Sequence, residues 1–83
     1  MVHNRYENCV RVTLKADCEE AARQLSLSDT VASETESGPP YCFFHNGVYG
    51  EELWFNNDVE AVSPCTSSDA CICKGMEVSV IIF

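Results

Sequence analysis

The sequence has few positive charges. It contains five Lys and Arg residues against 13 Asp and Glu residues, which gives a formal net charge of −8 with both histidines neutral. The cations are scattered, and each has acidic residues nearby in the sequence. Binding to nucleic acid phosphates requires clustered Lys and Arg, and anionic membrane surfaces attract the same clusters. The composition therefore argues against both as partners.

Long apolar runs are also missing. No segment approaches the roughly 20 apolar residues of a membrane-spanning helix, so we expect no membrane insertion. Residues 1–10, MVHNRYENCV, lack the apolar core of a signal peptide, and no Asn-x-Ser/Thr acceptor for N-glycosylation is present. Either the sequence is a mature or excised piece with an added Met, or the protein is not secreted. The cysteines described below favour the first alternative.

Residues suited to catalysis are sparse. The chain has only two histidines and no G-x-S-x-G nucleophile motif. The adjacent carboxylates Glu19/Glu20 and Glu51/Glu52 diverge on a helix or alternate on a strand, so they make a poor acid–base pair. We interpret His45 as a packed or surface histidine. We expect no enzyme, no catalytic residue, no metal and no cofactor.

The cysteine content is high for so short a chain. Eighty-three residues make one domain, 1–83, whose core is thin. Such a domain often needs covalent staples, because the entropy cost of ordering nearly cancels the gain from hydrophobic burial. The six cysteines form an even number, as three disulfides require.

Three of the cysteines lie close together in PCTSSDACICKG, residues 64–75. Structural zinc sites favour paired ligands two or four residues apart, supplied twice. Redox sites favour C-x-x-C near a βαβ pattern. The spacing C-x5-C-x-C fits neither, so structural disulfides are the favoured interpretation, with zinc and redox chemistry as minor alternatives.

Strand geometry narrows the disulfide pairing. Cys71 and Cys73 are two residues apart on a β-prone segment, so both point to one face and each needs its own partner. Cys65 is separated from Cys71 by a short Ser-rich loop. Other pairings stay open, but we expect three bridges: Cys65–Cys71, Cys18–Cys42 and Cys9–Cys73.

One segment has the pattern of a helix. In DCEEAARQLSL, residues 17–27, Asp17 is a good N-cap and Glu20 completes a capping box. One apolar stripe follows at helical spacing, formed by Cys18, Ala21, Ala22 and Leu25. The two alanines allow close packing on a sheet.

Several segments have the pattern of strands. Residues 9–14 alternate, with Val10, Val12 and Leu14 on one side. Asn46-Gly47 predicts a type I′ hairpin turn between two aromatic strands, while residues 28–40 are polar and predict a mobile surface loop. The predicted fold is α+β, with one short helix packed on an antiparallel sheet of roughly four or five strands and stapled by disulfides.

The aromatic residues supply the predicted binding surface, which consists of Trp54, Phe44 and Tyr49. Trp54 alternates with Leu53 and Phe55, so we expect it on the sheet face that the helix leaves open. We expect Phe44 beside it across the turn, and Phe43 in the core. Trp and Tyr are frequent anchors of interfaces. The alternative is that the 28–40 loop folds over Trp54.

The order of these motifs resembles a small cysteine-rich module of secreted and surface proteins in algae and other protists. The resemblance rests on CEEAARQLSLSDTVAS, PPYCFFHNGVYGEELWFN and PCTSSDACICK, within residues 18–74. At the level of the fold the chain is also similar to PAN/apple modules, and more weakly it resembles von Willebrand type C modules, whose full cysteine set it lacks. The resemblance implies an extracellular adhesive or structural unit and carries over no catalytic residue.

These observations predict a non-catalytic extracellular binding or structural module that acts through contact with a protein or a glycan. One alternative is a small accessory subunit buried in a larger assembly. Another is a secreted ligand-binding or inhibitory protein. We expect it to be part of a larger polypeptide or assembly, outside the cell or at its surface, although another oxidising compartment is compatible with the cysteines.

Overall fold

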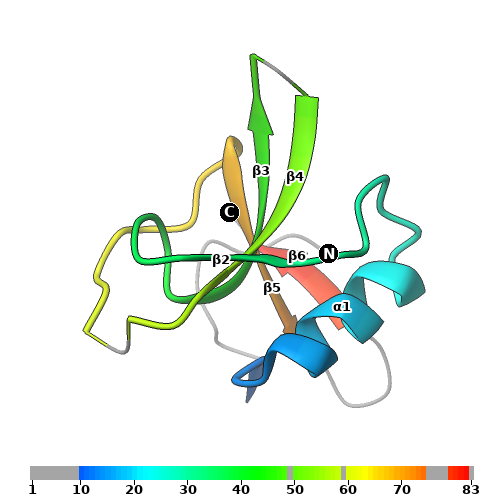
Figure 1. The fold of residues 1–83 in the computed structure, drawn as a ribbon, viewed down its shortest axis with the longest axis horizontal. Helices are drawn as coiled ribbons and strands as arrows, with labels where there is room; N and C mark the ends of the chain where they lie inside the picture. Colours follow the sequence, from blue (N-terminus) through cyan, green and yellow to red (C-terminus); the bar gives the residue numbers. More distant parts are fainter. Residues whose placement is uncertain (1–9, 49, 59, 75–78, 83) are drawn as a thin grey trace.

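The computed structural model describes residues 10–48, 50–58, 60–74 and 79–82 (for 79–82, the backbone only). One helix and six strands lie within these residues (Figure 1). In chain order they are β1 (Val10–Arg11), α1 (Lys15–Gln24), β2 (Ser33–Thr35), β3 (Tyr41–Gly47), β4 (Gly50–Asn56), β5 (Asp69–Lys74) and β6 (Ser79–Ile82).

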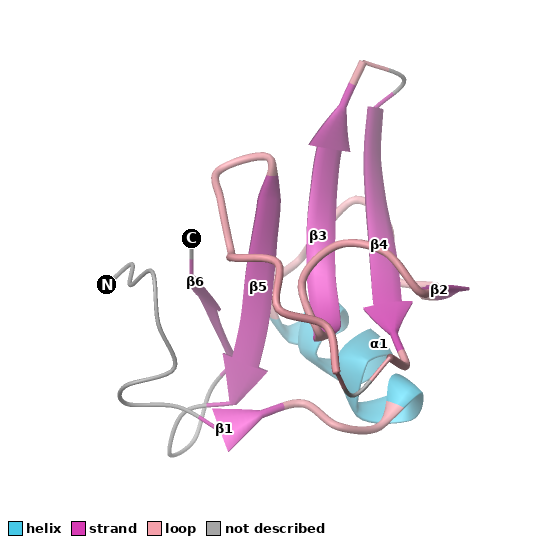
Figure 2. Cartoon of the chain, turned by 90° about the vertical axis from the view of Figure 1, so that its left-hand side faces the viewer, coloured by secondary structure: helices cyan, strands magenta, loops and turns pink. Residues whose placement is uncertain are grey.

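The strands form a single sheet with α1 on one face. The strand order is β1-β5-β3-β4-β2, and β6 pairs with β5. Figure 2 shows α1 behind the ends of β3 and β4, and α1 contacts β3, β4 and β5. The predicted disulfide-stapled α+β fold with one short helix on a sheet is confirmed.

The sheet is mixed, whereas the sequence predicts an antiparallel one. β2 pairs with β4 in parallel, with Ser33 opposite Trp54, while the other strand pairs are antiparallel. The segment predicted as a loop therefore contributes a strand. Asp29 helps to place it, because one carboxylate oxygen accepts from the Val31 N–H at 3.1 Å and the other from the Leu53 N–H at 3.0 Å. β2 has no apolar alternation, so its sequence pattern does not reveal it.

The helix begins earlier than its sequence predicts. Its first residue is Lys15, and Leu14 is the N-cap, with an extended backbone and no side-chain capping bond. The predicted N-cap, Asp17, lies in the first turn, where its charge still suits the helix dipole. Glu20 pairs with Arg23 at 2.8 Å instead of completing a capping box. The capping prediction is wrong because the helix starts before Asp17.

The buried stripe of α1 is as predicted. Cys18, Ala21 and Ala22 are buried, and Leu25 is half-buried. The small side chains let α1 lie close to the sheet, where it packs on a cluster that contains Cys42, Phe44, Leu53, Phe55 and Ile72. This layer between helix and sheet is the core.

The N-terminal strand is shorter than predicted. β1 ends at Arg11 because the chain then turns into α1. Val12 is buried, but Val10 and Leu14 are 71% and 61% exposed, so the predicted apolar face does not form at those two positions.

The disulfides agree with the predicted pairing where both cysteines are described. Cys18–Cys42 joins α1 to β3, and Cys65–Cys71 closes a short loop before β5. Cys73 is also disulfide-bonded. Its predicted partner, Cys9, lies outside the described residues, so that bridge stays a prediction.

The β3–β4 hairpin forms, but its turn lies further along than predicted. Asn46 pairs with Glu51 inside the ladder, and the last pair is Gly47 with Gly50. Gly50 has a φ of +115°, a conformation that other residues rarely adopt. The predicted turn residues, Asn46 and Gly47, are therefore strand residues.

Candidate functional site

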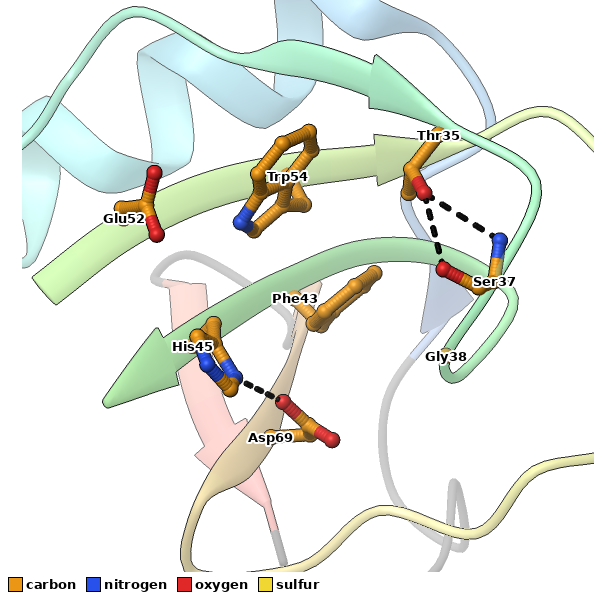
Figure 3. A pocket seen from close by; sticks show the side chains of 8 residues that line it. All are labelled: Thr35, Ser37, Gly38, Phe43, His45, Glu52, Trp54 and Asp69. Carbon is orange, nitrogen blue, oxygen red and sulfur yellow. Dashed lines mark hydrogen bonds and ion pairs between the residues drawn. The ribbon is translucent and has the colours of Figure 1, made fainter. Parts of the chain in front are cut away.

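The sheet face away from α1 carries a hollow of about 330 Å³ (Figure 3). Because side chains alternate along a strand, the residues next to the core residues point to this face. Four strands, β2 to β5, and the loop after β2 contribute to it. The lining residues are Thr35, Ser37, Gly38, Phe43, His45, Glu52, Trp54 and Asp69.

The strand register arranges the strand residues of the hollow in two rows. In the polar row, His45 stands between Asp69 of β5 and Glu52 of β4. In the aromatic row, Phe43 stands directly opposite Trp54. Direct cross-strand partners have Cβ atoms about 4.5–5.5 Å apart, so their side chains contact one another. The hollow thus has an aromatic floor next to a polar edge.

His45 is held by its neighbours. Its Nδ1 lies 2.5 Å from Oδ1 of Asp69, and both side chains are partly exposed, at 39% and 32%. Asp69 is placed in turn by its own N–H, which donates to Oγ1 of Thr66 at 3.0 Å. The imidazole also lies over Gly47, where an added Cβ would be 2.5 Å from Nε2. These contacts give the His45–Asp69 pair a defined position.

The loop after β2 forms the opposite wall. Gly38 has a φ of +91°, and a Cβ there would lie 2.7 Å from Cζ of Phe43, so its backbone rests on the aromatic ring. Its carbonyl accepts from Nδ2 of Asn56, a fully buried side chain, at 3.0 Å. The Oγ atoms of Thr35 and Ser37 lie 3.1 Å apart. Hydrogen bonds therefore hold this wall in place.

Trp54 is half-buried and lies in the hollow. Phe43 lies across from it and is only 4% exposed. The predicted alternation is confirmed, since Leu53 and Phe55 are both in the core. The 28–40 segment does not cover Trp54 completely: β2 borders it and the following loop walls the hollow.

The structure places Phe44 away from Trp54, in contrast to the prediction. Phe44 is 8% exposed and belongs to the core cluster, where it stands opposite Leu53. Residues that stand directly opposite each other on paired strands point to the same sheet face. Phe44 therefore points to the core face with Leu53, and Phe43 points to the face of the hollow with Trp54. Tyr49, the third predicted surface residue, lies outside the described residues.

The sequence prediction missed most of the lining. Matching the residues of the two strands outward from the predicted turn would have placed Phe43 and His45 on the same sheet face as Trp54. No pattern in the sequence brings Asp69 next to His45, because 24 positions separate them. Thr35, Ser37 and Gly38 lie in the segment predicted as a mobile loop.

The lining groups are suited to contact with a ligand. The two hydroxyls interact with each other, and in Figure 3 Phe43 stands between them and the His45–Asp69 pair. Within the described residues, no hydrogen bond joins a hydroxyl to the His45 side chain. Within the same part of the chain, no group of three or more His, Cys, Asp or Glu could hold a metal ion. What the hollow offers is an aromatic surface with hydrogen-bonding groups at its edge.

Comparison with known proteins finds no match for this chain among protein-family models, curated proteins or solved structures. Within the described residues, no helix has the length and apolar character needed to cross a membrane.

Proposed function

We propose that this chain is a non-catalytic extracellular binding or structural module, which acts through contact of the hollow around Trp54 with a protein or a glycan. The observation that carries this proposal is the position of Trp54. It lies half-buried in an open hollow, on the sheet face away from α1, beside Phe43 and with polar groups at the edges of the hollow. Large aromatic side chains in such settings are frequent anchors of interfaces.

The geometry of the polar groups supports contact in preference to catalysis. A general base must lie within hydrogen-bonding reach of the group that it activates. The His45–Asp69 pair and the Thr35–Ser37 pair are each satisfied internally, on opposite sides of Phe43. This arrangement favours a surface that binds over one that transfers a proton to a nucleophile.

The disulfides support the proposed location outside the cell or at its surface. Cys18–Cys42 and Cys65–Cys71 are compatible with an oxidising compartment. The resemblance to cysteine-rich modules of algal and protist surface proteins, which stays a prediction, agrees with this location.

Trp54 can be probed directly, because it is the only tryptophan in the chain. We expect an emission maximum typical of a partly hydrated indole and clear quenching by acrylamide in the native state. Acrylamide is neutral, whereas iodide would be repelled by a chain of net charge −8. Blue-shifted emission that acrylamide does not quench would place the indole in the core and remove the basis of the proposal.

Binding is then measured on arrays of oligosaccharides and immobilised peptides. For any ligand found, Trp54→Ala is expected to weaken binding by at least about tenfold, because anchor residues contribute most of the affinity. Val62→Ala is the matched control, since Val62 is 91% exposed and lies outside the hollow. Equal affinities for Trp54→Ala and the native chain would show that the contact surface lies elsewhere.

A further inference from the structure

The hollow is acidic as well as aromatic. Its lining includes the carboxylates of Glu52 and Asp69, and none of the described residues that line it is a lysine or arginine. Glu52 is exposed, and Asp69 is about one-third exposed. Both carboxylates are therefore accessible to a ligand that enters the hollow.

The register places one carboxylate beside the indole. Glu52 and Trp54 are two residues apart on β4 and point to the same face, about 6.5–7 Å apart along the strand. Figure 3 shows the Glu52 carboxylate and the Trp54 ring along one edge of the hollow. A cation is attracted to the face of an indole within about 6 Å of its centre. One positively charged group can thus contact the ring and reach the carboxylate.

Three of the four lysines and arginines among the described residues interact at other places, and the fourth, Lys74, is exposed and does not line the hollow. Lys15 pairs with Glu34 at 3.4 Å, Arg23 pairs with Glu20 at 2.8 Å, and Arg11 lies 5.8 Å from the centre of the Tyr41 ring. None of the three lines the hollow. Among the described lining residues, Asp69 pairs with His45, and no lysine or arginine neutralises the charge of Glu52.

The hydrogen-bonding character of the hollow distinguishes between possible ligands. A sugar hydroxyl both donates and accepts, so sugar sites generally offer both kinds of group. Here the Thr35 and Ser37 hydroxyls hydrogen-bond to each other. The other edge carries the carboxylates of Glu52 and Asp69, which only accept, with His45 between them. Lys and Arg side chains only donate, and their apolar stems pack well on aromatic rings.

We infer that the hollow binds the side chain of a lysine or arginine presented by a protein partner. The inference rests on the proposed function and assigns its ligand class. The stem of the basic side chain lies on Trp54, and its charged end donates to Glu52. The net charge of −8 attracts a basic partner from a distance and increases the association rate.

The test uses the full chain and the peptide acetyl-Gly-Gly-Lys-Gly-Gly-amide, followed by ¹H–¹⁵N correlation spectra at about 150 mM salt, where distant charges are largely screened. We expect shifts confined to amides around Phe43–His45, Glu52–Trp54 and Asp69. The same peptide with Nε-acetyl-lysine is neutral and is expected to lose at least about three-quarters of the shift. The arginine peptide is expected to behave like the lysine peptide.

Three variants separate local recognition from general attraction. Glu52→Gln and Trp54→Leu are each expected to weaken binding of the lysine peptide by about threefold or more. Glu60→Gln is the matched control, because it changes the net charge equally at an exposed position outside the hollow, and it is expected to leave the affinity unchanged. Native-like spectra of each free variant establish that it is folded.

Other outcomes overturn the inference. Equal weakening by Glu52→Gln and Glu60→Gln would show attraction to the whole acidic surface. Equal shifts with the lysine and acetyl-lysine peptides would show aromatic contact without recognition of charge. If chitotetraose shifts the amides of the hollow and the lysine peptide does not, the ligand is a glycan. The proposed function then stands and this inference fails.

Discussion

Gly38 is the residue on which the wall of the hollow depends. Its backbone has a left-handed φ of +91° and rests against the ring of Phe43. Its carbonyl accepts from the buried Asn56 side chain. A single residue therefore joins the loop after β2 to the aromatic row of the sheet, and only glycine meets both the conformational and the steric requirement.

Gly38→Ala is expected to lower the free energy of unfolding by about 2–4 kcal/mol, because it combines an unfavourable φ with overlap of the new methyl group and Phe43. Urea denaturation measures the loss, and Trp54 emission is expected to shift as the wall moves.

Gly50→Ala is the control for this substitution. Gly50 has a φ of +115°, but an added Cβ meets no atom within 4 Å. Only the conformational part of the cost applies, about 1–2 kcal/mol. Equal losses for the two variants would show that the contact with Phe43 does not contribute.

At the scale of elements, α1 depends on its attachment to the sheet. It has ten residues, and an isolated helix of this length is marginal in water. Its buried stripe consists mainly of alanine and cysteine, which bury little apolar area. The Cys18–Cys42 bridge therefore supplies a large part of what holds α1 against β3 and β4.

Removing this bridge with Cys18→Ala/Cys42→Ala is expected to lower the free energy of unfolding by about 3.5 kcal/mol, because the loop-closure entropy of the unfolded chain increases with the sequence separation, which is 24 here. Cys65→Ala/Cys71→Ala, with a separation of 6, is expected to cost about 2 kcal/mol. Thermal unfolding of the two variants, followed by far-UV circular dichroism, tests whether the first variant loses more stability than the second. An unchanged helix signal and midpoint in the first variant would show that packing alone holds α1.

At the scale of the whole molecule, disulfides and acidic charge act together. The strong net charge of −8 favours solubility but also produces repulsion within the folded chain. Cross-links oppose that repulsion because they restrict the unfolded state. A small acidic domain of this kind is suited to an oxidising compartment.

The native mass is expected to lie about six daltons below the fully reduced mass, because three disulfides remove six hydrogen atoms. Intact-mass spectrometry before and after reduction gives the difference, and peptide mapping under non-reducing conditions tests the Cys9–Cys73 bridge. Six free thiols in the native protein would contradict the proposed extracellular location.

Taken by itself, the sequence determined the fold class, the buried stripe of α1 and the alternation around Trp54, and it led to an expected pairing of which two disulfides are confirmed. These features follow from local physics: the 3.6-residue period of helices, the two-residue period of strands, and the short reach of cysteines that are close in sequence or lie on facing elements. Where the pattern depends on neighbours along the chain, the sequence is sufficient.

The tertiary structure alone decided the composition of the hollow. Strand register places Phe43 with Trp54 and Phe44 in the core, and the pairing of β3 with β5 brings Asp69 to His45. The polar strand β2 joins β4 through backbone hydrogen bonds and carries the loop of Gly38 to Phe43. Backbone pairing does not depend on the apolar pattern, so contacts between distant polar segments leave no periodic signal in the sequence.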